Sequence, residues 1–270
     1  MRAGRDRDAA RRWAELLAGW AIPEELRASV ARDPHRFDVA RFVRAAEAAE
    51  AAGPADSPSL RRSLAAVPAG GSVLDVGCGA GAASLPLVPP AASVIGVDAQ
   101  PDMLPAFAAR AGTRGAAVTT VAGRWPDVAG GVGVADVVVC HHVVYNVADL
   151  VPFVSALTDH ARCRVVVELS QRHPLAWLAP YWRALHDLDR PDGPTSQDAV
   201  AVLRATGLRP EVEHWDAPGQ RPDEDPAERL AALRGRLCVG PERDAELADA
   251  IAAFPPPTVR PTTTLWWDVG

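Results

Sequence analysis

The order of apolar runs along the chain constrains its fold more than any other feature of the sequence. From residue 72 onward, short β-branched runs alternate with segments of helical or loop character. We expect five of these runs to be strands, at about 72–76, 93–97, 117–121, 135–140 and 163–169. Runs such as SVLDV and ADVVVC are almost wholly apolar, which is typical of strands covered on both faces. The pattern therefore predicts a parallel, doubly wound α/β sheet.

The pattern changes after the fifth strand. A helix is expected at about 175–188, and a second follows an N-cap at Thr195 or Ser196. Two more strands are expected, at about 209–215 and 262–269, and two short helical segments lie between them, at about 227–236 and 242–253. A strand, a long excursion and a final strand indicate an antiparallel pair at the edge of a seven-stranded sheet.

Helices are also expected before the first strand. A stripe of large apolar residues at helical spacing, which Pro23 ends, is formed by Trp13, Leu16, Leu17 and Trp20. A second helical stretch covers about 35–52, carries Phe37 and Phe42, and ends at Gly53-Pro54. A short helix follows, with Ser57 as its expected N-cap.

Charge and cysteine usage disfavour several function classes. The formal net charge is −6, which disfavours the broad basic face that nucleic acids require. No run approaches the roughly 18 apolar residues of a membrane span, so we expect a cytoplasmic protein. The four cysteines are widely scattered, so neither a metal site nor a disulfide framework is predicted.

A glycine-rich loop follows the first expected strand. Gly77, Gly79 and Gly81 lie where open α/β sheets place their ligands, and a helix is expected to point its N-terminus at this crevice. Asp98 ends the next strand about twenty residues later, where a carboxylate can accept hydrogen bonds from ribose hydroxyls. Asp75 is an acid inside a buried strand, and it favours a cationic ligand over a pyrophosphate. A dinucleotide stays open as an alternative at this point.

Four segments together indicate a family. VLDVGCGAG and VIGVDAQPDML resemble the first two motifs of class I S-adenosylmethionine-dependent methyltransferases, whereas ADVVVCHHVVYNVADL and RVVVEL are similar to their fourth motif and fifth strand. The resemblance covers about 56–215 and the final strand. It implies a Rossmann-like, mostly parallel seven-stranded sheet with an antiparallel edge strand, and S-adenosyl-L-methionine as cofactor.

The resemblance also implies a set of residues around the cofactor. Asp75 would orient the ammonium group of the methionine part, Asp98 would hold the ribose, and Met103 would cover the adenine. Trp125 would stack on the adenine beside backbone contacts. The complete implied set is Asp75, Gly77, Cys78, Gly79, Gly81, Asp98, Gln100, Met103, Gly123, Arg124, Trp125, Cys140 and His141.

The acceptor side is expected at the ends of the fourth and fifth strands. His141 and His142 are the candidate bases, since histidine titrates near neutral pH. The candidate acceptor-binding residues are Tyr145, Asn146, Glu168, His173, Trp177 and Tyr181. We expect residues 1–55 to form a helical segment over the active site. The methyltransferase domain would span 56–270, with helical insertions near 171–194 and 217–258.

These residues predict methyl transfer to oxygen or nitrogen of a small molecule. Three alternatives stay open at the level of sequence: a nucleic-acid or protein methyltransferase on the same fold, a cofactor-binding module without transfer activity, and an NAD-dependent oxidoreductase. The sequence leaves the acceptor, the methylated atom and the oligomeric state open.

Overall fold

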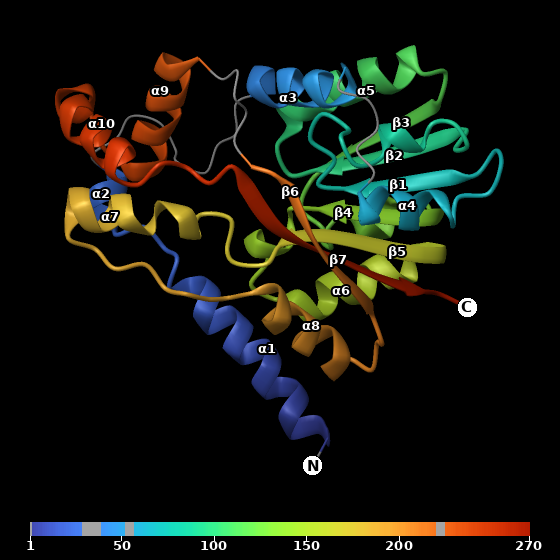
Figure 1. Cartoon of the computed structure of the whole chain (residues 1–270). Helices are drawn as coiled ribbons and strands as arrows, with labels where there is room; N and C mark the ends of the chain where they lie inside the picture. The colour runs from blue at the N-terminus through green and yellow to red at the C-terminus, as the bar shows by residue number, and fades with distance from the viewer. Residues whose placement is uncertain (1, 29–38, 52–56, 220–224) are drawn as a thin grey trace.

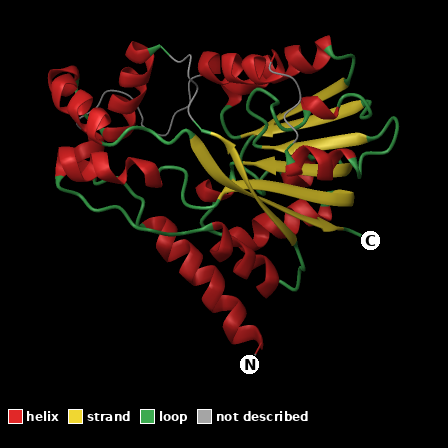
Figure 2. Cartoon of the chain, in the orientation of Figure 1, coloured by secondary structure: helices red, strands yellow, loops and turns green. Residues whose placement is uncertain are grey.

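A computed structural model describes residues 2–28, 39–51, 57–219 and 225–270. Its centre is one seven-stranded sheet with the order β3-β2-β1-β4-β5-β7-β6 (Figures 1 and 2). The strands are β1 (Ser72–Val76), β2 (Ser93–Asp98), β3 (Ala117–Ala122), β4 (Ala135–His141), β5 (Ala161–Ser170), β6 (Glu211–Pro218) and β7 (Val259–Asp268). Each strand overlaps the expected run, because the β-branched runs were unambiguous.

The sheet direction agrees with the sequence as well. Strands β1 to β5 pair in parallel, whereas β7 runs antiparallel to both β5 and β6. The reversed strand is thus β7, and β6 lies outside it at the sheet edge. The five parallel strands all end at one edge, which is where ligands bind in sheets of this kind.

Helices cover both faces of the sheet (Figure 1). One face packs against α4 (Pro58–Leu64) and α5 (Leu104–Thr113), and the other against α6 (Leu150–Asp159), α8 (Ser196–Ala205) and α1 (Arg2–Ala18). Successive strand residues alternate between these faces. Leu74 and Val76 therefore enter the α6 side of the core, while Val73 enters the α5 side. Asp75 shares the side of Val73, by the same alternation.

A further helical layer lies beyond the edge where the parallel strands end (Figure 1). It consists of α2 (Glu24–Ala28), α7 (Ala179–His186), α9 (Pro226–Leu237) and α10 (Asp244–Ala253). These helices share a small core of their own, which includes Leu178, Tyr181, Trp182, Leu237 and Leu247. The helices expected in the two insertions are therefore present, although α7 begins at Ala179 after a 3-10 turn at Ala176–Leu178.

Helix α3 (Val39–Ala51) lies beside α5, where its Glu50 pairs with Arg114 at 3.0 Å and with Arg110. It is the described part of the second expected N-terminal stretch. Phe37 and the expected end at Gly53-Pro54 lie outside the described residues.

One expected element is missing. The glycine loop leads into only a three-residue 3-10 helix, Leu85–Leu87, so the expected α-helix with its N-terminus at the crevice is wrong. Pro86, Pro89 and Pro90 follow within nine residues of Gly81. Proline lacks the backbone N–H that an α-helix interior needs and restricts the residue before it, so this segment cannot propagate a helix.

Two helix caps agree with the sequence. The Ser57 hydroxyl accepts a hydrogen bond from the Leu60 amide at 3.1 Å, as expected for the N-cap of α4. For α8 the cap is Thr195, the first of the two candidates, in a capping box with Asp198. Their side chains also meet directly, with Thr195 Oγ1 2.8 Å from Asp198 Oδ2.

We predict that Thr195→Ala lowers the free energy of unfolding by about 1 kcal/mol, since it removes an N-cap acceptor. Urea titration followed by circular dichroism measures the change. Gln197→Ala is the matched control, because Gln197 is exposed on the same helix. An equal loss in both variants would contradict a specific contribution of the cap.

Candidate active site

The glycines of the loop after β1 are required for different structural reasons. Gly77 has a φ of +78°, and a Cβ there would lie 2.2 Å from Val143 Cγ2. Gly81 has a φ of +85°, and its Cβ would meet Leu85 at 2.6 Å. The protein's own packing therefore excludes side chains at these two positions. At Gly79 the nearest atom is a Phe42 ring carbon of α3, 3.5 Å away, so this glycine presents its backbone outward.

Asp98 joins the loops that follow three neighbouring strands. Its Oδ2 accepts a hydrogen bond from the Gly79 amide and its Oδ1 from the Gln100 amide, each at 2.8 Å. The Gly123 amide donates to the Asp98 carbonyl at 2.9 Å and brings in the end of β3. A carboxylate has about four acceptor positions. Asp98 is only partly buried and can still accept hydrogen bonds from a diol.

Asp75 is buried on β1 with one oxygen satisfied. The Ser84 hydroxyl donates to its Oδ2 at 2.6 Å, whereas Oδ1 has no hydrogen-bond partner. Burial raises the pKa of this carboxyl to about 7. A buried acceptor without a partner is costly, and a cationic donor would remove that cost. The residues at this edge therefore fit a ligand that carries both an ammonium group and a ribose.

His141, His142 and Glu168 meet at the ends of β4 and β5. His142 Nε2 lies 3.0 Å from Glu168 Oε1, and His141 Nδ1 lies 4.0 Å from Glu168 Oε2. The His142 amide also donates to the Glu168 carbonyl at 2.7 Å. The His142 side chain is 40% exposed, whereas that of Glu168 is 8% exposed. The buried carboxylate of Glu168 therefore orients the accessible imidazole of His142.

The electrostatics of this cluster separate the two histidines. Burial opposes ionisation of Glu168, but His141, His142 and the Ser59 hydroxyl outweigh it and hold its pKa well below the usual range. Burial lowers the pKa of His141, although Glu168 acts in the opposite direction. His141 Nε2 is buried without a partner. His141 is thus the more enclosed ring, and His142 is the one that reaches the surface.

The remaining expected cofactor residues lie in varied surroundings. Met103 is buried after β2, and Arg124 is exposed after β3. Cys78 and Cys140 point their side chains into the two sides of the core, so only their backbone can border a ligand. Burial raises the pKa of both thiols, which keeps them protonated and unreactive.

The expected stacking of Trp125 on an adenine is wrong. Its indole is buried in the core, where Nε1 donates to the Phe153 carbonyl at 3.3 Å and the ring meets His160 edge-on. An indole is a large apolar group, and burial in the core is its usual use. The ring is thus withdrawn from the candidate site.

The side chains of Tyr145 and His173 pack against other residues of the protein. This corrects their expected role as acceptor contacts. The Tyr145 hydroxyl donates to the Ser170 carbonyl at 2.7 Å, and its ring stacks on Trp13. His173 stacks on Trp20 with ring centroids 3.9 Å apart. Burial and then Arg190 lower the pKa of His173 to about 3, so it is neutral. The two rings hold the N-terminal segment against the sheet.

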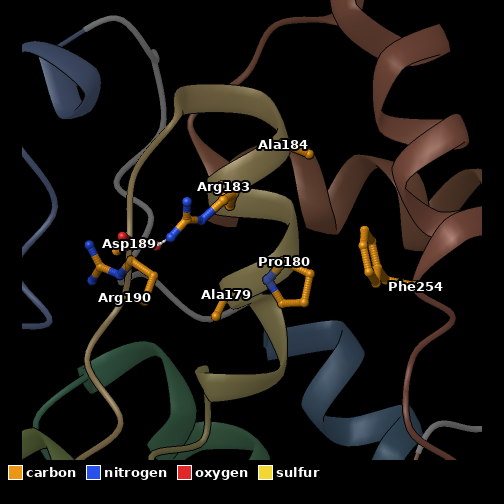
Figure 3. A pocket seen from close by; sticks show the side chains of 7 residues that line it. All are labelled: Ala179, Pro180, Arg183, Ala184, Asp189, Arg190 and Phe254. Carbon is orange, nitrogen blue, oxygen red and sulfur yellow. Dashed lines mark hydrogen bonds and ion pairs between the residues drawn. The ribbon is translucent and has the colours of Figure 1, made fainter.

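Trp177 and Tyr181 belong to the core of the outer helical layer and not to an acceptor pocket. Tyr181 is fully buried and its hydroxyl donates to the Phe254 carbonyl, while Trp177 packs edge-on against it. The other side of α7 does line a cavity, of about 360 Å³ (Figure 3). Its lining residues are Ala179, Pro180, Arg183, Ala184, Asp189, Arg190 and Phe254. Of the tentative acceptor set, exposed Asn146 and buried Glu168 remain.

Comparison with known proteins identifies the central part of the chain. Residues 73–163, which run from β1 through β4 into β5, match the family model of a methyltransferase domain. Over these residues the chain has a methyltransferase domain, on the fold of the class I S-adenosylmethionine-dependent methyltransferases. This methyltransferase is therefore an enzyme whose cofactor is S-adenosylmethionine. No protein of curated function matches the chain.

Solved structures agree with the methyltransferase fold. The YcgJ protein from Bacillus subtilis is 18% identical, with a TM-score of 0.53 over 77% of this chain and 96% of that chain. A putative methyltransferase from Bacillus halodurans C-125 is 17% identical, with a TM-score of 0.52 over 78% of this chain and 96% of that chain. At these identities the likeness concerns the fold alone.

Sequence reasoning missed several residues of the site. Ser84 and Val143 contact Asp75 and Gly77, and Ser59 contacts Glu168. Ser84 is the last residue of the glycine-rich segment. Because a buried acid, Asp75, lies nearby in the sequence, a hydrogen bond from the Ser84 hydroxyl to it could have been predicted. Ser59 gave no such signal, because it lies more than one hundred residues from Glu168 in the sequence.

We predict that Asp98→Ala weakens binding of S-adenosylhomocysteine by about 1.5 to 3 kcal/mol, or roughly 10- to 150-fold, through loss of charge-assisted hydrogen bonds. Isothermal titration calorimetry measures the affinity. Asp127→Ala is the control, since Asp127 is exposed and should leave the affinity unchanged. An unchanged affinity in Asp98→Ala would show that the ribose is held elsewhere.

We predict that affinity for S-adenosylhomocysteine rises between about pH 6 and about pH 8. The Asp75 pKa of about 7 means that the free protein holds a proton there, and pairing with an ammonium group expels it. Calorimetry in two buffers of different ionisation enthalpy measures the released proton. In Asp75→Asn both the release and this pH dependence should disappear.

The same shift has a consequence for the free protein. Between the ordinary Asp pKa and about 7, the unfolded chain ionises Asp75 while the folded chain keeps it protonated. This group therefore lowers the free energy of unfolding as the pH rises through that window. Urea titrations should show a smaller decline in Asp75→Asn; an identical decline would contradict the raised pKa.

Proposed function

We propose that this methyltransferase transfers the methyl group to oxygen or nitrogen of a small-molecule acceptor, with His142 as the general base. The observation that carries the proposal is the pair of His142 and Glu168, 3.0 Å apart at the edge where the parallel strands end. A histidine oriented by a carboxylate is a recurrent arrangement for removing a proton from a hydroxyl or an ammonium group.

S-adenosylmethionine, when bound, supplies a methyl carbon that its positive sulfur activates for in-line displacement. The residues of the chain then have to align the acceptor and take up its proton. Glu168 accepts from His142 Nε2, so His142 Nδ1 is left to receive a proton from the acceptor. His142 has a φ of +60°, a backbone conformation that non-glycine residues rarely adopt. Such strain persists where the surroundings fix it and is frequent at active sites.

The backbone around His142 supports a location next to the cofactor. Val143 fills the space where a Cβ of Gly77 would lie. The loop after β4 therefore packs directly on the glycine loop. On this basis we propose that the base stands beside the reacting methyl group, with His141 enclosed behind it.

We also propose where the cofactor lies. Asp75 would hold the ammonium group, the backbone of Gly77, Cys78 and Gly79 would follow the methionine part, and Asp98 would hold the ribose. The adenine would lie among Gln100, Met103 and the backbone at Gly123 and Arg124. The support is that Asp98 and Gly123 already tie the ends of β1, β2 and β3 together by hydrogen bonds.

A small acceptor is favoured by the elements around this edge. Helix α3 lies over Gly79 through Phe42, and its Arg44 pairs with Glu228 of α9 at 3.2 Å. Trp13 and Trp20 pack on Tyr145 and His173, after β4 and β5. We therefore propose that residues 1–55 cover the active site. A covered site of net acidic protein suits a small molecule better than a nucleic acid.

The location belongs to the proposal as well. Within the described ranges, every helix is too short or too polar to span a bilayer. The four cysteines are free thiols, and three of them are buried. Free thiols are usual in reducing compartments, which supports a cytoplasmic enzyme.

The test of the function is a transfer assay with methyl-labelled S-adenosylmethionine. Pools of phenols, hydroxy compounds and amines are offered in parallel with tRNA, duplex DNA and a protein mixture. We expect label in the small-molecule pools. Label confined to nucleic acid or protein would overturn the acceptor class, and binding of the cofactor without transfer to any pool would favour a binding module.

We predict that His142→Ala lowers kcat by roughly 100- to 10,000-fold with the acceptor so found, because general-base assistance is lost. Affinity for S-adenosylhomocysteine should change little. His214→Ala serves as the control, since His214 is an exposed histidine of β6 that contacts Thr263. A kcat that stays within twofold of the unmodified enzyme would remove His142 from the chemistry.

A further inference from the structure

A chain of polar side chains crosses the buried face of the sheet beneath α4. Trp215 of β6, Thr264 of β7 and Ser59 of α4 lead to Glu168 of β5 and from there to His142. Trp215 Nε1 lies 3.1 Å from Thr264 Oγ1, and Thr264 Oγ1 lies 2.6 Å from Ser59 Oγ. Thr264 and Glu168 are opposite residues of the antiparallel pair β5 and β7. Residues of β6, β7 and α4 and the residue after β4 thus converge on one carboxylate of β5.

Burial makes this chain more than a surface contact. Ser59 and Thr264 are fully buried, and Glu168 is 6% exposed. Polar groups so enclosed need hydrogen-bond partners inside the protein, and a satisfied network fixes the geometry of its members. Ser59 lies close enough to Glu168 for its hydroxyl to lower the pKa of that carboxyl, and it is bonded to Thr264, the cross-strand neighbour of Glu168.

The direction of every hydrogen bond in the chain is determined by its two ends. An indole N–H donates only, so Thr264 accepts from Trp215. An ionised carboxylate accepts only, so the single hydroxyl proton of Ser59 goes to Glu168. Ser59 then has no proton for Thr264, and the Thr264 hydroxyl donates to Ser59. All donors therefore point from Trp215 toward Glu168.

The same logic fixes the proton on His142. Because Glu168 accepts only, the atom of His142 that faces it, Nε2, carries the hydrogen. In the neutral ring the lone pair is then on Nδ1. The chain thus sets which nitrogen of His142 is basic.

We propose that Ser59 and Thr264 are positioning residues that hold Glu168 as a directed acceptor and thereby lock His142 in the tautomer with a basic Nδ1. The inference deepens the proposed function and rests on it for its catalytic consequence, although the tautomer itself does not. Thr264 orients Ser59, Ser59 orients Glu168, and Glu168 orients His142. Ser59 and Thr264 act through Glu168 and His142.

The experiment reads the tautomer directly, without an acceptor. Protein labelled with ¹⁵N-histidine is studied by long-range ¹H–¹⁵N NMR at alkaline pH, with His142→Gln used to assign the signals. In the unmodified protein we expect His142 to be protonated at Nε2. Ser59→Ala and Thr264→Val should show a mixture of both tautomers.

Two further variants separate positioning from general destabilisation. Thr264→Ser keeps the hydroxyl and should keep the tautomer of the unmodified protein. Thr263→Val is the matched control: Thr263 is the equally buried neighbour, but it faces Ser196 on the other side of the sheet, at 3.0 Å. It should lose stability without a change at His142. Thermal unfolding of each variant establishes that it is folded.

The assay of methyl transfer completes the test. Ser59→Ala and Thr264→Val should lower kcat by roughly 10- to 100-fold, as expected for a misoriented group, with the KM for S-adenosylmethionine unchanged. A His142 that stays entirely protonated at Nε2 in both variants would overturn the proposal. A tautomer that changes while kcat remains unaffected, in these variants and in His142→Ala alike, would support the positioning chain and reject His142 as the base.

Discussion

The burial of Glu168 is the constraint on which the described architecture around the active site depends. A carboxylate removed from water loses several kcal/mol of hydration, and this loss has to be offset by partners with good geometry. The partners come from the end of β4, from α4, and, through Ser59, from β7. These partners all lie on the face of the sheet that α4 covers, so a carboxylate on the opposite face would not reach them. Helix α4 packs on β5 and β7 and brings the buried Ser59 to this carboxylate.

The sequence allowed most of the sheet and part of the cofactor site to be predicted. β-branched runs with apolar faces on both sides have few other uses, so all seven strands and the antiparallel pairing of the last two were foreseen, but not that β7 lies inside β6. Asp75, as an acid inside a buried strand, and Asp98, at a strand end, were expected at the cofactor from local sequence alone, and their roles stay a prediction. The missing helix after the glycine loop was a failure of a different kind. There the three prolines outweighed the usual strand-to-helix order.

Aromatic residues were the least predictable part of the site. A tyrosine or tryptophan at helical spacing near a strand end suits a ligand pocket and a core equally. The choice was made by partners far away in the chain: Trp13 stacks on Tyr145, and Trp20 stacks on His173. Ser59 and Thr264 are separated by 205 positions, and no local pattern links them. Contacts of this range depend on how the elements pack, which spacing within one element does not encode.

The direction of the hydrogen bonds beneath α4 determines how the catalyst returns to its starting state. Trp215 cannot accept a proton at its indole nitrogen, so the row of hydroxyls has no exit for one. The row of hydroxyls orients Glu168 but cannot conduct a proton away from it. In the proposed mechanism, a proton taken up at His142 Nδ1 departs from the exposed side of the ring, directly to water or to buffer. In this mechanism no proton passes through the buried hydroxyls during turnover. The imidazole of His142 returns to its neutral form by losing its proton to solvent.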